Sequence, residues 1–200
     1  MKTLSSITRL LCLAFLVVTG VGCDTGVQES PEPGVLRVTM QADPADTTIV
    51  IAGQVLTVSP SDSFGVTIYQ GRAFRDTLFA VLLKSTTSYR ERDYVYNVFQ
   101  RDGSEFAEFV IFESLLPPGD YDSLRFSASA EMLSIGSFLI PVRLPPDADP
   151  AMDFPARFRI AERDTTEIKV MLRPLESVRR FRDMYLFHRQ FEVTHIENPS

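Results

Sequence analysis

The sequence predicts an all-β protein: a single β-sandwich, immunoglobulin-like or prealbumin-like, with about nine or ten short strands. Three observations support this fold class. Between residues 35 and 196, apolar side chains alternate with polar ones at the period of two that a half-buried strand requires. Turn-forming residues separate these runs at regular spacing. No segment has an amphipathic helical pattern long enough to form a helical layer.

The first half of the region contains short apolar runs that predict strands at 36–40, 49–58, 64–68, 78–83 and 89–99. In the second run, Gly53 is expected to mark a bulge. The fourth run is continuously apolar, which predicts a central strand buried on both faces. The fifth run has mixed polarity and ends at a turn formed by Arg101-Asp102-Gly103-Ser104.

The second half predicts strands at 106–112, 121–130, 138–144, 154–160, 168–172 and 185–193. Ile135-Gly136-Ser137-Phe138 predicts a two-residue hairpin of type II′, because glycine occupies the first central position. Residues 175–184 are compatible with a short helix or a loop. The last strand is expected to point four side chains inward: Tyr185, Phe187, Phe191 and Val193.

Residues 1–22 have the features of a bacterial lipoprotein signal peptide. Lys2 and Arg9 supply positive charge, and residues 10–18 form an apolar run far shorter than the roughly 20 residues that a membrane-spanning helix needs. Small residues then lead to Cys23 in a segment that resembles a lipobox. The resemblance implies that Cys23 is lipidated and becomes the first mature residue. An ordinary secretory signal with a chance cysteine is the alternative.

After the signal, the chain divides into a tether and one domain. Residues 23–34 are polar and rich in Pro and Gly, so they cannot bury a core and predict a flexible tether. Residues 35–196 are expected to form the sandwich, and residues 197–200 a tail. A domain of this size buries roughly 70% of its unfolded surface, enough for a core of its own.

Cysteine usage and charge exclude several classes of protein. Cys12 would leave with the signal and Cys23 would carry lipid, which excludes an intramolecular disulfide and a cysteine metal cluster. The formal net charge is −6, and loss of Lys2 and Arg9 makes it more negative by two. Nucleic acid is therefore not an expected partner, because a general nucleic-acid-binding protein needs a basic surface.

The segment LLPPGDYDSLRFSAS, residues 115–129, poses a choice between a ligand loop and a structural corner. Gly119 follows two prolines and predicts a tight turn, and Tyr121 begins the next strand. A tyrosine at this position packs its ring on the edge of the core and hydrogen-bonds its hydroxyl to nearby backbone. A calcium site at Asp120 and Asp122 is the alternative, although calcium wants six or more oxygens.

The order of several motifs resembles an uncharacterised family of bacterial lipoprotein β-sandwich domains. The resemblance covers residues 34–193 and rests on GVLRVTM, LPPGDYDSLRFSAS, IPVRLPP, TTEIKVMLRPLESV and MYLFHRQFEV, in that order. Two features depart from the family: the segment ADPADT after the first strand, and the absence of tryptophan. The family has no established activity, so the resemblance implies an extracytoplasmic prealbumin-like or carbohydrate-binding-like fold and a location.

Catalytic and metal motifs are not apparent. His188 and His195 are seven apart and would face opposite sides of a continuous strand, without the three clustered ligands that zinc needs. Asp147, Asp149 and Asp153 share one loop but lack the glycine and closing glutamate of an EF-hand. No nucleophile elbow, phosphate loop or dinucleotide fingerprint is present. A dispersed Ser-His-Asp triad stays open, but no cofactor or metal is expected.

The stretch SYRERDYVYNVF offers the best candidate for a binding surface. On a strand, Arg90, Arg92, Tyr94 and Tyr96 would share one face, and arginine and tyrosine are enriched at binding hot spots. The alternative is an exposed strand whose rings lie on the sheet.

The basic run 173–189 is a second candidate, for an anionic envelope component. A solvated loop balanced by Glu176 and Asp183 is its alternative reading.

These observations predict a non-catalytic, lipid-anchored β-sandwich of the bacterial envelope, held at the outer membrane or cell surface. The N-terminal lipid would bind the membrane, and the domain would bind a glycan or an envelope protein, or serve a structural role. A carbohydrate-binding module that uses the aromatic strand face is the first alternative, and an envelope hydrolase is the second.

Overall fold

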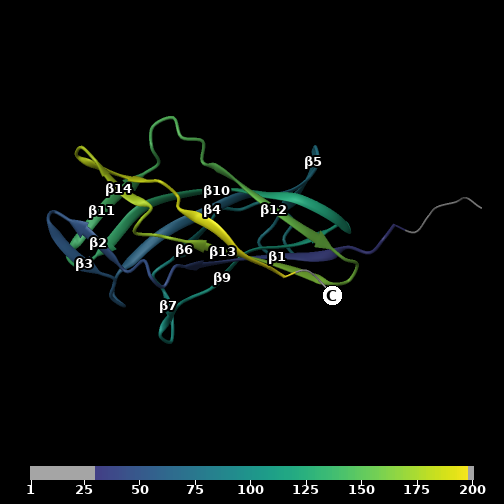
Figure 1. The fold of residues 1–200 in the computed structure, drawn as a ribbon, viewed down its shortest axis with the longest axis horizontal. Helices are drawn as coiled ribbons and strands as arrows, with labels where there is room; N and C mark the ends of the chain where they lie inside the picture. Colours follow the sequence, from purple (N-terminus) through teal and green to yellow (C-terminus); the bar gives the residue numbers. More distant parts are fainter. Residues whose placement is uncertain (1–29, 198–200) are drawn as a thin grey trace, which may run out of the picture. The chain divides into compact units, whose positions relative to one another are not determined.

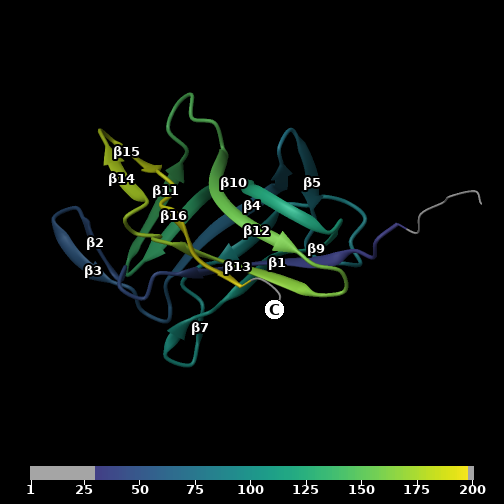
Figure 2. The same ribbon diagram turned by 45° about the vertical axis from the view of Figure 1, so that its right-hand side comes forward.

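The computed structural model describes residues 30–197. These residues form an all-β protein whose sheets pack together, which confirms the predicted β-sandwich (Figures 1 and 2). The signal peptide, Cys23 and most of the tether lie outside the described residues. Within residues 30–197, no helix has the length and apolarity needed to cross a membrane.

The smaller sheet has four strands, in the order β16 (Phe191–Glu197), β13 (Thr165–Leu172), β1 (Gly34–Ala42) and β9 (Phe109–Leu116). β1 is parallel to β13 and antiparallel to β9. The predicted alternation is confirmed, since every second side chain of β1 from Leu36 to Met40 is buried. The domain is slightly longer than expected: β1 begins at Gly34, and Glu197 still pairs with Glu167.

The larger sheet is built around two long antiparallel strands, β4 (Ser63–Arg75) and β10 (Gly119–Ile135). The free side of β10 pairs with β12 (Ala151–Ile160) and then with β11 (Phe138–Arg143). The free side of β4 pairs with β5 (Leu78–Leu82) and with β6 (Tyr94–Asn97). Beyond β11, the sheet continues into β15 (Met184–Phe187) and β14 (Val178–Phe181).

Two small hairpins complete the fold: β2 (Thr48–Ile51) with β3 (Gln54–Thr57), and β7 (Arg101–Asp102) with β8 (Glu105–Phe106). The first corrects the prediction of one bulged strand over 49–58. Ala52 and Gly53 both have positive φ, 50° and 79°, so they form the two central residues of a type I′ turn. Gly53 therefore reverses the chain instead of bulging it.

Aromatic rings join the two sheets. The ring of Phe126 on β10 lies 6.1 Å from that of Phe112 on β9 and 5.6 Å from that of Phe191 on β16, measured between centroids. β9 and β16 are the two edges of the smaller sheet, so one residue of the larger sheet contacts both. Full burial of a phenylalanine stabilises a fold by about 1.5–3 kcal/mol. Contacts of this kind hold the sheets together in a domain without an expected disulfide.

Two further strand predictions are wrong. β5 is an edge strand, not a central one, and Leu78 and Phe79 are largely exposed there. The expected last strand over 185–193 is two strands in different sheets, because the chain crosses from β15 to β16 after Phe187. Residues 175–184 supply β14 and the turn of the β14–β15 hairpin, so neither the helix nor the loop describes them fully.

The corner at the start of β10 has the predicted form. Tyr121 is buried, its hydroxyl donates to the carbonyl oxygen of Pro117 at 2.9 Å, and its ring stacks on Phe158 with centroids 5.3 Å apart. Gly119 has a φ of 149°, and a Cβ there would lie 2.5 Å from a guanidinium nitrogen of Arg75. Gly119 and Tyr121 therefore have structural roles in this turn, and neither role requires a ligand.

Candidate functional site

A β-bulge in β4 lies between the two strands whose connecting loop forms the best candidate site. The pairing of β4 with β10 shifts register between Tyr69 and Arg72, where Gln70 adopts a positive φ of 55°. β5 pairs with β4 on one side of this bulge and β6 on the other, along the same edge. The chain therefore leaves the edge after β5 and returns at Tyr94. We call residues 83–93 the β5–β6 loop.

Contacts from two directions fix the start of this loop. The amide of Leu83 donates to Ser114 Oγ at 2.6 Å, and the Leu83 carbonyl accepts from the amide of Glu113 at 2.9 Å. These bonds attach the loop to β9 in the opposite sheet. A turn follows, in which the Ser88 amide donates to the carbonyl of Ser85 at 3.0 Å. The backbone of the loop is thus held by hydrogen bonds on both sides of Lys84.

Lys84 is the most unusual charged residue near the site. Its ammonium donates to Tyr96 Oη at 2.7 Å and to the Val110 carbonyl, and it lies 5.5 Å and 4.7 Å from the ring centroids of Tyr94 and Tyr96. Burial lowers the pKa of Lys84, because desolvation disfavours its charged form. Burial likewise raises the pKa of Tyr96. Lys84 therefore contacts the side chains of both tyrosines.

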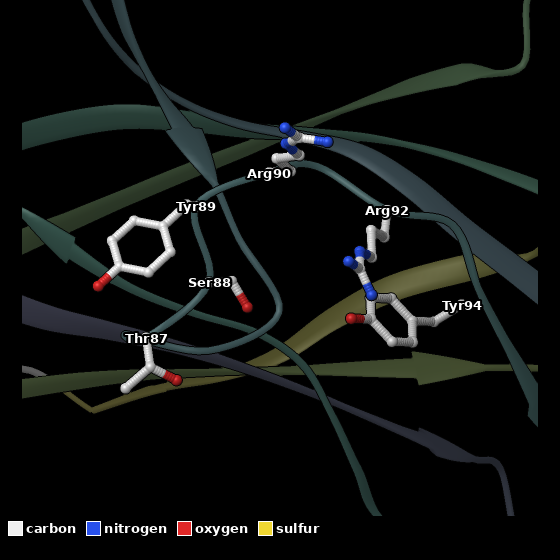
Figure 3. Close-up of a pocket in the computed structure, with 6 residues that line it drawn as sticks. All are labelled: Thr87, Ser88, Tyr89, Arg90, Arg92 and Tyr94. Atoms are coloured by element: carbon white, nitrogen blue, oxygen red, sulfur yellow. The ribbon is translucent and has the colours of Figure 1, made fainter.

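The β5–β6 loop surrounds a pocket of about 350 Å³. Six residues line it: Thr87, Ser88, Tyr89, Arg90, Arg92 and Tyr94. Figure 3 shows Tyr89 on one side of the pocket and Arg92 with Tyr94 on the other. Tyr89 is 96% exposed. The volume falls in the range of small-molecule sites.

The positive and negative side chains of the loop lie in different surroundings. Arg90 and Arg92 line the pocket, while Glu91 between them forms an ion pair with Arg72 of β4. Asp93 lies near Tyr69: burial raises the pKa of that tyrosine, and the Asp93 charge raises it further. Within residues 30–197, neither Arg90 nor Arg92 has an ion-pair partner. The pocket lining therefore carries two positive charges and no carboxylate.

The predicted face of Arg90, Arg92, Tyr94 and Tyr96 needs correction in two respects. The strand begins only at Tyr94, so both arginines lie in a loop and not on a strand. Tyr96 does lie on the same side of β6 as Tyr94, but it is only 7% exposed and sits behind Lys84. Arg90, Arg92 and Tyr94 therefore line one pocket, whereas Tyr96 is buried and does not line it.

Three of the acidic candidates have structural partners. Asp122 Oδ2 accepts a hydrogen bond from the amide of Asp76 at 2.9 Å, and Asp149 Oδ1 accepts one from the amide of Ala151 at 2.9 Å. Asp153 pairs with Arg125 at 2.5 Å. The part of the chain that the structure describes contains no group of three or more His, Cys, Asp or Glu residues placed to hold a metal ion. These carboxylates close turns and pair strands.

The remaining candidates are dispersed. His188 lies between β15 and β16 and His195 on β16, both exposed, so the expected continuous strand does not connect them. The basic run 173–189 forms mainly the β14–β15 hairpin. Arg173 in that run pairs with Asp43 at 3.3 Å and with Glu176 at 3.5 Å, in line with a solvated and balanced segment.

The sequence interpretation missed half of the pocket. Thr87, Ser88 and Tyr89 belong to it but not to the predicted face, because the prediction of a strand with strict alternation is wrong for this loop. One signal was available: TTS before YRER is a cluster of turn-forming hydroxyl residues, which argues against a continuous strand.

Comparison with known proteins adds no relative. No family model, curated protein or solved structure matches this chain.

Proposed function

We propose that this protein is a non-catalytic, lipid-anchored binding module of the bacterial envelope. The observation that supports binding most strongly is the pocket of the β5–β6 loop, whose six lining side chains all carry hydrogen-bond donors and include an almost fully exposed tyrosine. The lining contains neither carboxylate nor imidazole, the groups most often used as general base or acid. That composition favours a binding site over a hydrolase.

The N-terminal sequence supplies the support for membrane attachment. The lipobox-like segment before Cys23 and the polar tether after it suit a domain held close to a membrane by lipid. One acyl chain gives marginal and reversible binding, whereas several make attachment stable. The tether would let the sandwich project its loops away from the headgroups.

The anchor is tested by fractionating cells that express the Cys23→Ser variant. We expect this variant to leave the membrane fraction, with a mass that lacks acyl chains. Cys12→Ser is the matched control, since this residue would be removed with the signal, and its product should stay in the membrane. Retention of Cys23→Ser in the membrane at wild-type level would show that lipid on Cys23 does not hold the protein.

Carbohydrate binding is the second candidate function, and the placement of Tyr89 and Tyr94 favours it. Both tyrosines line a pocket of about 350 Å³ that also contains the hydroxyls of Thr87 and Ser88, a set of side chains on which a sugar ring can pack and with which it can exchange hydrogen bonds. A glycan array tests it with Tyr89→Ala and Tyr94→Ala. Phe181→Ala on β14 is the control, because it removes a half-exposed ring elsewhere. Binding that survives both tyrosine changes would exclude this site.

A further inference from the structure

We propose that the pocket of the β5–β6 loop recognises an anionic group carried on a sugar: a sulfate, a phosphate or a carboxylate. The inference rests on the proposed binding function and names the chemistry of its ligand. It follows from three features: the donor groups of the pocket, the placement of the neighbouring acids, and the contrast between the positive pocket and the negative chain.

The first feature is the chemistry of the lining. All six side chains can donate hydrogen bonds, and two of them are guanidiniums, which stay charged and present planar pairs of donors. Arginine binds tetrahedral and planar oxyanions with two parallel hydrogen bonds. Arg90 and Arg92 are exposed, and within residues 30–197 neither has an ion-pair partner, so both charges are available to a ligand. An oxyanion would satisfy them together with the hydroxyls of Thr87 and Ser88.

The second feature is the way neighbouring acids are kept out. Glu91 is next to both arginines in sequence, yet it pairs with Arg72 on β4, whose guanidinium also lies 5.5 Å from the ring centroid of Phe79. Asp93 lies on the Tyr69 side of the chain. Arg72 therefore holds the nearest carboxylate away from the pocket, and the positive potential of Arg90 and Arg92 stays available to a ligand.

The third feature is the contrast between the pocket and the whole chain. The chain has a net charge of −6, which repels polyanions at long range. A positive pocket in such a protein suits a small, locally recognised anion and not a long polyanion. Tyr89 and Tyr94 both line the pocket, and Tyr89 is 96% exposed, so the sugar that carries the anion can pack against an aromatic ring there.

The test is an array of sulfated, phosphorylated, uronate-containing and neutral oligosaccharides, probed with the full mature protein in a neutral detergent. We expect binding to one anionic class, weakened by added salt and competed by free inorganic sulfate or phosphate, or by glucuronate for the carboxylate class. The class that binds distinguishes the three sources of negative charge. Arg90→Gln with Arg92→Gln should weaken binding at least about tenfold, since both charge-assisted interactions are lost.

The matched control is Arg179→Gln with Arg180→Gln. These exposed arginines on β14 give the same change in net charge at a distance from the pocket. An equal loss of binding in this control would overturn the inference, because it would show diffuse attraction. Binding of neutral oligosaccharides that is unaffected at Arg90 and Arg92 would also overturn it, while the binding module would stand. A wild-type protein that binds no probe at all would contradict both.

Discussion

Single polar side chains form hydrogen bonds with backbone groups in turns that have no partner on a neighbouring strand. The Tyr121 hydroxyl bonds to the Pro117 carbonyl, four residues earlier in the chain. Asp62 accepts hydrogen bonds from the amides of Ser59 and Gly136, at 2.7 Å and 2.9 Å. Buried backbone groups need partners, and these side chains supply them where no neighbouring strand can. The first contact is local and readable from sequence, whereas Gly136 is too distant in sequence for a pattern to reveal.

Loss of the Tyr121 hydroxyl should lower the free energy of unfolding. In Tyr121→Phe the ring still stacks on Phe158, but the carbonyl of Pro117 loses its donor. We expect the free energy of unfolding to fall by about 1 kcal/mol, measured by urea denaturation at neutral pH. Tyr89→Phe is the control and should change nothing, because Tyr89 is 96% exposed. Equal stability of both variants would show that the corner does not depend on this bond.

The two lysines that follow Cys23 should titrate differently. Burial lowers the pKa of Lys84, while the charge of Glu108 raises the pKa of Lys169, with a further contribution from Glu167. Lys84 should therefore lose its proton at lower pH than Lys169. The measurement is an NMR titration of ¹³C-dimethylated protein, with Lys84→Arg to assign the resonances. Coinciding curves would contradict the desolvated position of Lys84 behind Tyr94.

At the scale of elements, alternation predicted most strands and missed those at the edges. The inward faces expected for β10, β12 and β13 are buried. β5 was misassigned because a continuous apolar run is typical of a central strand, yet here it lies beside a bulge at the margin of the sheet. The grouping of Arg90, Arg92 and Tyr94 was predicted from their sequence spacing, although only Tyr94 lies on a strand. The bulge at Gln70 was not, because it depends on packing against the opposite sheet.

That packing can be tested at Gly71. A Cβ on this residue would lie 2.7 Å from the ring of Phe112 and 2.9 Å from Leu82 Cβ, so Gly71→Ala must displace buried groups. We expect it to lower the free energy of unfolding by about 1–3 kcal/mol. Gly65→Ala is the control, because its Cβ would meet only the exposed Val95 at 3.3 Å. The measurement is the urea midpoint of each variant.

A second background separates crowding from other effects of Gly71→Ala. In Phe112→Leu the ring that the new methyl group contacts is removed, so part of the loss at Gly71 should be recovered. An unchanged penalty in that background would show that the bulge, and not Phe112, requires glycine.

At the scale of the whole molecule, strands that are distant in sequence pair to form the smaller sheet. β1 pairs with β13, and β13 in turn pairs with β16 at the end of the described chain. The smaller sheet therefore cannot form until most of the chain is available. Such long-range pairing implies folding in milliseconds to seconds, as in other all-β domains. β16 is the edge strand of this sheet, and it pairs with the side of β13 that faces away from β1.

A truncation after Gln190 should consequently abolish the folded domain. The edge of β13 would lose its partner, and Phe126 would lose the ring of Phe191, 5.6 Å away, through which it contacts β16. The partly buried ring of Phe191 and the backbone pairing of β16 are lost together, and the stability of a typical domain is only about 5–15 kcal/mol. Thermal unfolding and size-exclusion chromatography should show an unfolded or aggregated chain.

Truncation after Glu197 keeps every described pair of β16 and should melt like the full chain. Native melting of the shorter variant would mean that β13 can serve as the edge of the smaller sheet, and that the contact between Phe126 and Phe191 does not hold the two sheets together.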